Sequence, residues 1–119
     1  MNVEMIANGK LKIAVVDGVA LATPQDMLDL IAALHYQNEA EGLVIPKENL
    51  AEEFFDLRTG LAGEMLQKCT NYQMKIAIVG DFTVYDSKAL RDFIRECNRG
   101  TSVFFLPGRE DAVTALQNS

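Results

Sequence analysis

The chain has 119 residues, of which 49% are hydrophobic and 24% are charged, and it carries a formal net charge of −6. This length predicts a single domain spanning residues 1–119, with enough apolar surface for a core that needs no disulfide or metal. We expect a cytoplasmic protein, because no apolar run approaches the ~18 residues that span a bilayer, no basic-then-apolar leader opens the sequence, and two cysteines cannot form a disulfide scaffold.

The negative charge belongs to the first half of the chain. Residues 1–60 hold four Lys or Arg and ten Asp or Glu side chains, whereas residues 61–119 hold seven of each kind. An acidic chain repels phosphate backbones unless a local basic patch overrides the repulsion. We therefore expect no nucleic-acid partner, and the hydropathy indicates no membrane partner.

The first two strands are expected to form a hairpin. Segments Val3–Ala7 and Lys10–Val16 flank Asn8-Gly9, the dipeptide that best tolerates the positive φ angles of a two-residue type I′ turn. Downstream, Thr23-Pro24 with Asp26 predicts a helix start, because a hydroxyl cap, a proline at the first helical position and an acid in the first turn all favour one.

Strands and helices alternate through the rest of the chain. The expected elements are a strand over Leu43–Ile45 stopped by Pro46, a short helix or turn within Lys47–Thr59 over the sheet edge, a helix over Gly60–Asn71, a strand over Met74–Val79, a helix capped by Asp86 or Ser87 and ended by Gly100, a strand over Ser102–Leu106 and a helix over Glu110–Gln117. The order β-β-α-β-α-β-α-β-α predicts an α/β fold with a mixed, mostly parallel sheet of about five strands, an N-terminal hairpin and four to five helices.

Three blocks of sequence resemble a known family. They are FFDLRTGLAGEMLQK, KIAIVGDFTVY and RDFIRECNRGTSVFF, and they lie between Glu53 and Leu106. With them, nearly the whole chain resembles the bacterial family known as domain of unknown function 4180. That resemblance implies no particular activity.

The element order and one local pattern also resemble the STAS domains, the anti-sigma-factor-antagonist fold. In that fold a buried strand leads to an Asp, a phosphorylatable Ser or Thr, and a Gly-Leu pair that opens the next helix. The corresponding residues here are Asp56, Thr59, Gly60 and Leu61, with two residues between Asp56 and Thr59 where that fold has one small residue. The resemblance implies a STAS-like fold and a phosphorylation switch at Thr59.

Thr59 and its neighbours allow two interpretations. The Thr59 hydroxyl would face the free N–H groups of a helical first turn, which suits either an N-cap or a bound phosphate. Arg58 could bind an anion or pair with an acidic side chain nearby. Gly60 and Gly63 cost about 1 kcal/mol each relative to alanine within a helix, so either another element packs tightly against them or a ligand approaches the backbone.

A second candidate segment follows the strand over Met74–Val79. Ligands of open α/β sheets bind outside the carboxyl ends of the strands, where Asp81 and Tyr85 would lie, with Thr59 on the same edge. Asp81, Tyr85 and Ser87 are therefore candidates for an interaction surface. Their polar groups would otherwise close turns and cap the next helix.

Catalytic and metal motifs are not recognised in the sequence. His35 is the single histidine and has no nucleophile placed beside it, and Cys69 and Cys97 fall on buried helical faces. We therefore predict no catalytic residue, no metal and no cofactor. A carboxylate pair stays open as an alternative, drawn from Glu52, Glu53, Asp56, Glu64 and Asp81.

A basic row lies on the predicted helix after Ser87. Arg91, Arg95 and Arg99 recur at every fourth position, with acidic residues interleaved, which is typical of an ion-paired, solvent-facing side. The alternative is a docking surface for acidic groups. Another copy of the chain would supply such groups, and would make a homo-oligomer, through Glu48, Glu52, Glu53 and Asp56.

Taken together, these patterns favour a non-enzymatic regulatory protein. It would act through contacts with an unidentified protein, or by sensing a small molecule, at an edge that includes Thr59 and Asp81. The alternative is a small enzyme or metabolite-binding protein that works at the same edge with Asp56, Arg58, Glu64, Asp81 and Tyr85. Convergent carboxylates in a pocket would favour that alternative.

Overall fold

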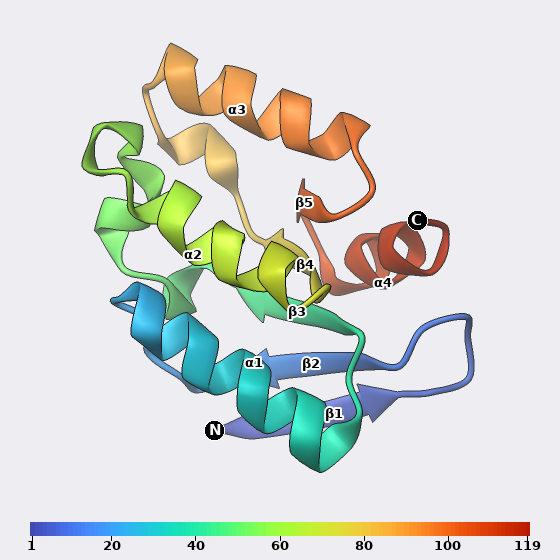
Figure 1. Ribbon diagram of the computed structural model, residues 1–119. Helices are drawn as coiled ribbons and strands as arrows, with labels where there is room; N and C mark the ends of the chain where they lie inside the picture. The colour runs from blue at the N-terminus through green and yellow to red at the C-terminus, as the bar shows by residue number, and fades with distance from the viewer.

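The five strands form one sheet in the order β1-β2-β3-β4-β5. Figure 1 shows the computed structural model, which describes residues 1–119. Strand β1 runs antiparallel to β2, and each later strand runs parallel to its neighbour. The elements are β1 (Asn2–Ile6), β2 (Ile13–Asp17), α1 (Pro24–Asn38), β3 (Gly42–Pro46), the 3₁₀ turns η1 (Lys47–Asn49), η2 (Glu52–Phe55) and η3 (Leu57–Thr59), α2 (Leu61–Asn71), β4 (Lys75–Val79), η4 (Phe82–Val84), α3 (Lys88–Arg99), β5 (Val103–Leu106) and α4 (Arg109–Gln117). The predicted α/β class and element order are confirmed.

Three helices cover one face of the sheet, and α4 covers the other (Figure 1). Neighbouring parallel strands joined by right-handed crossovers place every connecting helix on the same side. Alternate residues of β3 accordingly point to different cores: Leu43 and Ile45 pack with α1 and α2, whereas Val44 packs with Leu116 of α4. No helix combines the length and hydropathy needed to cross a lipid bilayer.

The hairpin forms, but its turn differs from the prediction. The strand register ends at the pair Ile6 and Ile13, so residues 7–12 make a six-residue loop in which neither Asn8 nor Gly9 has a positive φ. The reason lies at the other end of the chain. The Leu11 amide donates to the Gln117 side chain at 2.7 Å, and that side chain donates back to the Leu11 carbonyl at 3.0 Å. The type I′ turn was therefore a wrong prediction, because α4 supplies the partner that the opposite strand would have supplied.

The capping residues in the sequence correctly predict where α1 and α3 begin. The Thr23 hydroxyl accepts from the Asp26 amide at 3.1 Å and the Asp26 carboxylate accepts from the Thr23 amide, which together form a capping box. Ser87, one of the two predicted caps, accepts from the Leu90 amide at the start of α3. The segment predicted as a short helix or turn within residues 47–59 consists of three 3₁₀ turns.

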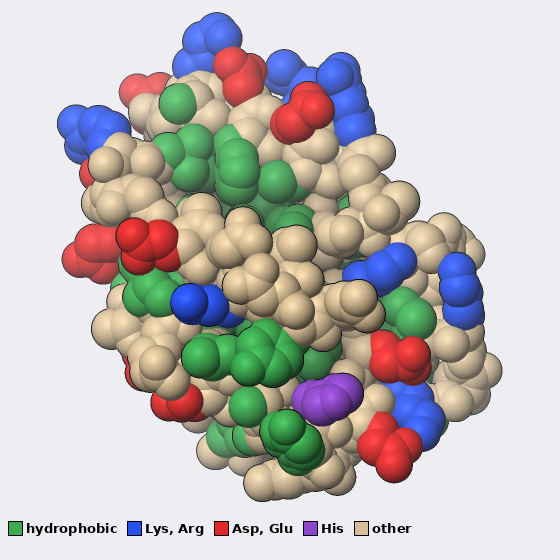
Figure 2. Space-filling model, viewed as in Figure 1, with side chains coloured by type: hydrophobic (Ala, Val, Ile, Leu, Met, Phe, Trp, Pro, Cys, Tyr) green, Lys and Arg blue, Asp and Glu red, His purple; other side chains and the backbone are tan.

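Helix α3 lies over the edge strand β5 and is only partly covered. Its apolar residues recur at helical spacing, yet Leu90 alone is buried, while Phe93, Ile94 and Cys97 keep some exposed surface. Figure 2 shows hydrophobic side chains gathered between α2 and α3, with lysine and arginine side chains along the outer side of α3. This edge of the fold is therefore the place where apolar surface meets solvent.

The exposed edge of β5 is occupied by a side chain of α3. The carbonyl of Ser102 accepts from the Ile76 amide of β4 and that of Leu106 accepts from the Gly80 amide directly after β4, so the polar backbone groups of Phe105 face outward. The Asn98 amide meets both of them: its Nδ2 donates to the Phe105 carbonyl at 3.0 Å, and its Oδ1 accepts from the Phe105 amide at 2.8 Å. Asn98 therefore occupies the positions that another strand would use for pairing.

We predict that Asn98→Ala destabilises the fold and promotes self-association, even though alanine is the better helix former. Losing both hydrogen bonds should lower the free energy of unfolding by about 1–2 kcal/mol, measured by urea denaturation, and the freed edge should increase the mass in analytical ultracentrifugation. Asn8→Ala, in the exposed β1–β2 loop, is the control. If the two variants match in stability and mass, Asn98 does not protect the edge.

Candidate functional site

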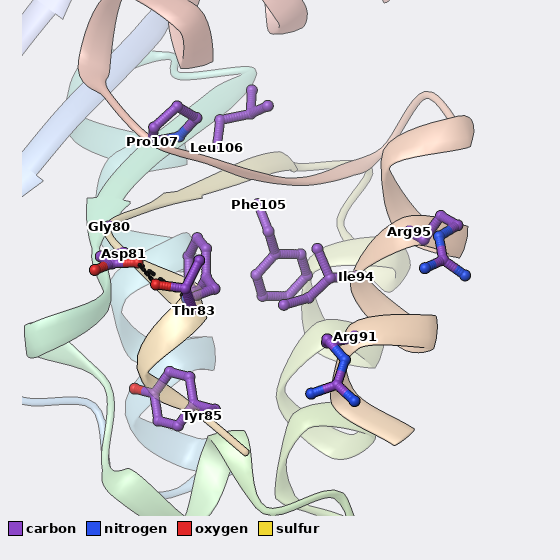
Figure 3. Close-up of a pocket in the computed structure, with 11 residues that line it drawn as sticks. Gly80, Asp81, Thr83, Tyr85, Arg91, Ile94, Arg95, Phe105, Leu106 and Pro107 are labelled. Atoms are coloured by element: carbon purple, nitrogen blue, oxygen red, sulfur yellow. Dashed lines mark hydrogen bonds between the residues drawn. The ribbon is translucent and has the colours of Figure 1, made fainter. Parts of the chain in front are cut away.

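An open groove lies beyond the carboxyl ends of β4 and β5, between η4 and α3 (Figure 3). Its volume is about 680 Å³, which is within the range of small-molecule sites. The residues that line it are Gly80, Asp81, Phe82, Thr83, Tyr85, Arg91, Ile94, Arg95, Phe105, Leu106 and Pro107. The groove therefore combines an apolar floor with charged groups on its sides.

Asp81 supplies the carboxylate on the η4 side. One of its oxygens accepts from the Thr83 hydroxyl at 2.5 Å and from the Thr83 amide at 3.0 Å. These two hydrogen bonds, followed by the charge of Lys47, hold the pKa of Asp81 below its ordinary value of 3.8. Asp81 is the only carboxylate that lines the groove, so the carboxylate pair considered from the sequence is not assembled there.

Arg91 and Arg95 stand on the α3 side, one turn apart (Figure 3). The ion pairs expected along this helix form between Lys88 and Asp92 at 2.7 Å, Arg95 and Asp92 at 3.3 Å, and Arg99 and Glu96 at 3.7 Å. Arg91 makes no ion pair in the structure. Two arginines of the row predicted to face solvent, Arg91 and Arg95, therefore line the groove. Of these two, Arg91 has no carboxylate partner.

Tyr85 joins the groove to the segment after β3. Its ring stacks on Phe55 with centroids 4.8 Å apart, and its hydroxyl accepts a hydrogen bond from Lys47 Nζ at 3.3 Å. Burial lowers the pKa of Lys47, but its hydrogen bond to Tyr85 and the negative charge of Glu48 outweigh this and raise the pKa above its ordinary value of 10.5. Lys47 is therefore a fixed cation beneath the Asp81 side of the groove, and the sequence offered no signal for it.

The segment that contains Thr59 lies on the connection into α2 and does not line the groove. The Thr59 hydroxyl donates toward the carbonyls of Glu53 and Asp56, both at 2.8 Å, and accepts from the Leu61 amide at 3.2 Å. Arg58 pairs with Asp56 through two hydrogen bonds of 3.0 Å. Thr59 thus ties the turn before α2 together, and its phosphorylation stays a prediction.

The two glycines near the start of α2 do not pack against another element. A Cβ at Gly60 or Gly63 would find no atom of another element within 4 Å, so the tight-packing interpretation of these glycines is wrong. Gly60 is instead needed for its backbone, which has a φ of +76° at the N-cap of α2. Gly63 has no such conformation, and it lies exposed near Glu64 in the first turns of the helix.

The predicted site residues therefore separate into two groups. Asp81 and Tyr85 line the groove and Ser87 caps the adjoining helix, whereas Asp56, Arg58, Thr59, Gly60, Gly63 and Glu64 lie outside its lining. The sequence interpretation missed Arg91 and Arg95 as groove residues, because their regular spacing with acids indicated only ion pairs. It also missed Phe105, whose ring contacts become visible only in three dimensions.

The remaining reactive residue types lie outside the groove lining. His35 meets the ring of Tyr36 edge-on, with centroids 5.4 Å apart. Burial raises the pKa of the Cys69 thiol to about 12, and burial followed by the charge of Glu96 also raises the pKa of Cys97. No three His, Cys, Asp or Glu side chains gather in a way that could hold a metal ion.

We predict that Thr83→Val raises the pKa of Asp81 toward 3.8, because the variant removes the hydroxyl but keeps the amide donor. Since the folded-state pKa lies below the unfolded value, Asp81 stabilises the fold above that value and loses this contribution as the pH falls through the folded pKa. Carboxyl NMR titration measures the shift. Thr70→Val, which removes a hydroxyl bonded to the Leu66 carbonyl, should leave Asp81 unchanged; an unmoved Asp81 in Thr83→Val would refute the assignment.

Alanine at the two glycines of α2 should have opposite effects. We expect Gly60→Ala to lower the free energy of unfolding by about 1 kcal/mol, because its φ is left-handed. Gly63→Ala should raise it by up to about 1 kcal/mol, since the site is helical and sterically open. Thermal and urea unfolding measure both values, and a shared sign would contradict the backbone argument.

The model of the family described as Domain of unknown function (DUF4180) matches residues 7–116, a span that runs from the β1–β2 loop into α4. No curated protein and no solved structure matches the chain. The resemblance to this family is confirmed, while the broader resemblance to the STAS domains stays a prediction. The chain therefore belongs to the DUF4180 family of domains of unknown function.

Proposed function

We propose that this protein is a regulatory, ligand-sensing domain that binds a small molecule in the groove between η4 and α3. The observation that carries the proposal is the groove itself: an open cavity of about 680 Å³, floored by apolar side chains and flanked by charged ones, at the carboxyl edge of a parallel sheet. Ligands of open α/β folds bind at this edge. Pockets that combine an apolar lining with a few polar groups are the usual form of small-molecule sites.

The proposal assigns binding rather than catalysis to the groove. A general base or acid works best with a pKa near the operating pH. The pKa of Asp81 lies below 3.8 and that of Lys47 above 10.5, so each group is held in its charged form. Such groups attract and orient a ligand, but they are poorly suited to exchanging protons with it.

A protein partner would respond to the ligand through the surface around Thr59. Phe55 stacks on Tyr85 of the groove and also lies 6.1 Å from Phe82, measured between ring centroids. The same residue ends η2, directly before the turn that holds Asp56 and Thr59. A ligand that moves either groove ring therefore pushes on the segment that carries the partner surface, which we define as Asp56, Arg58, Thr59, Gly60, Gly63 and Glu64.

A fragment screen by ¹H–¹⁵N NMR tests the proposed function. We expect fragments that bind to shift the amides of Asp81, Thr83, Ile94 and Leu106, and not that of Val44, which is buried on the opposite face of β3. Fragments that bind most strongly should also shift the amides of Asp56 and Thr59. A screen whose binders all map away from the groove would contradict the proposal, and shifts confined to the groove would contradict the link to the partner surface.

A further inference from the structure

We propose that the groove selects an anionic ligand with a flat aromatic body, with its anionic group at Arg91 and Arg95. This inference rests on the proposed function and names the chemical class of the ligand. It depends on three features of the groove: the shape of its floor, the separation of charge between its sides, and the unpaired state of Arg91.

The floor of the groove is largely aromatic. Phe82 and Phe105 meet edge to face, with centroids 5.4 Å apart and an angle of 82° between the rings. Phe105 is nearly fully buried, and the ring centroids of Phe93 and Phe54 lie 5.9 Å and 6.4 Å from its own. Edge-to-face and offset-stacked arrangements are the favourable ones for aromatic groups. A flat ring of the ligand can therefore pack against Phe82, which keeps exposed surface beside the edge-to-face pair.

The charges of the groove are separated between its two sides (Figure 3). Asp81 lies with η4, and both arginines lie with α3, so an anionic group is repelled at one side and attracted at the other. The charge of Asp81 is already engaged by two hydrogen bonds from Thr83. A ligand thus gains most by placing its anionic group on the α3 side.

Arg91 is the guanidinium best able to accept such a group. Arg95 shares Asp92 with Lys88, and Arg99 faces Glu96, whereas Arg91 has no ion-pair partner. A guanidinium presents parallel N–H donors that match the oxygens of a carboxylate, sulfonate or phosphate. Arg91 lies in the first turns of α3, where the partial positive charge of the helix end adds to its own.

Two fluorescent probes test this inference with the intact protein. 1-Anilinonaphthalene-8-sulfonate and N-phenyl-1-naphthylamine share one aromatic skeleton and differ in the sulfonate. We expect the sulfonate to bind at least tenfold more tightly, and Arg91→Gln to weaken its binding about tenfold while leaving the neutral probe unchanged. Arg99→Gln removes the same charge from the same helix outside the groove, and should change neither affinity. Both substitutions lie at exposed helical positions, so the variants are expected to fold.

The outcomes separate this inference from the proposed function. If both probes shift the groove amides in NMR spectra with equal affinity, or if Arg91→Gln has no greater effect than Arg99→Gln, the groove binds ligands without selecting anions and the inference is overturned. If neither probe shifts those amides, the inference is overturned by itself, and the fragment screen decides the proposed function separately. A tenfold preference for the sulfonate that disappears only in Arg91→Gln supports both.

Discussion

The sequential strand order is the constraint on which the rest of this fold depends. With β2 to β5 side by side and parallel, right-handed crossovers place α1, α2 and α3 on one face and leave the other face to α4. The sheet ends at β5, so α3 packs over the edge of the sheet. Only part of the apolar side of α3 is therefore covered by a strand. Leu90 is buried there, while Ile94 keeps the exposed surface that becomes one side of the groove. The groove is thus a consequence of topology, and the amphipathic sequence of α3 keeps it apolar within and charged at its rim.

The same topology gathers polar groups from separate strands at one edge. Parallel strands all end on the same side of the sheet, so Lys47 after β3, Asp81 after β4 and Pro107 after β5 come to lie near one another although they are far apart in the sequence. Gly80 makes this approach feasible, because a Cβ at that position would lie 2.6 Å from the Lys47 side chain. The absence of a side chain at Gly80 lets the lysine stem run beneath the groove toward the Tyr85 hydroxyl, and the stacked Phe55 ring holds Tyr85 from the other side.

Structural features that depend on neighbouring residues were predicted from the sequence, whereas features that depend on residues distant in the chain were missed. The caps at Thr23 and Ser87 and the alternation of elements follow from short-range preferences, so the α/β order emerged correctly. The hairpin turn failed because Gln117, more than a hundred residues from Leu11, satisfies the loop backbone. A rule about sheet edges predicts the place of Asp81 and Tyr85 beside the groove, whereas the charge pattern of α3 assigns Arg91 to an ion-paired row. Helical spacing shows which residues share a side of α3, whereas only the position of β5 decides which of them face the groove.

The two charged sides of the groove keep their polarity across the pH range in which proteins work. Guanidinium groups stay protonated there, and Asp81 stays ionised because Thr83 and Lys47 hold its pKa below 3.8. The net charge of −6 opposes this local attraction only weakly, since fields from exposed charges farther than about 8 Å are screened at physiological ionic strength. Groups in direct contact with a ligand therefore decide its orientation. Separated charges and an aromatic floor suit the ligand recognition that we propose, and the Phe55 ring, stacked on Tyr85 at the end of η2, connects the groove to the segment that carries Thr59.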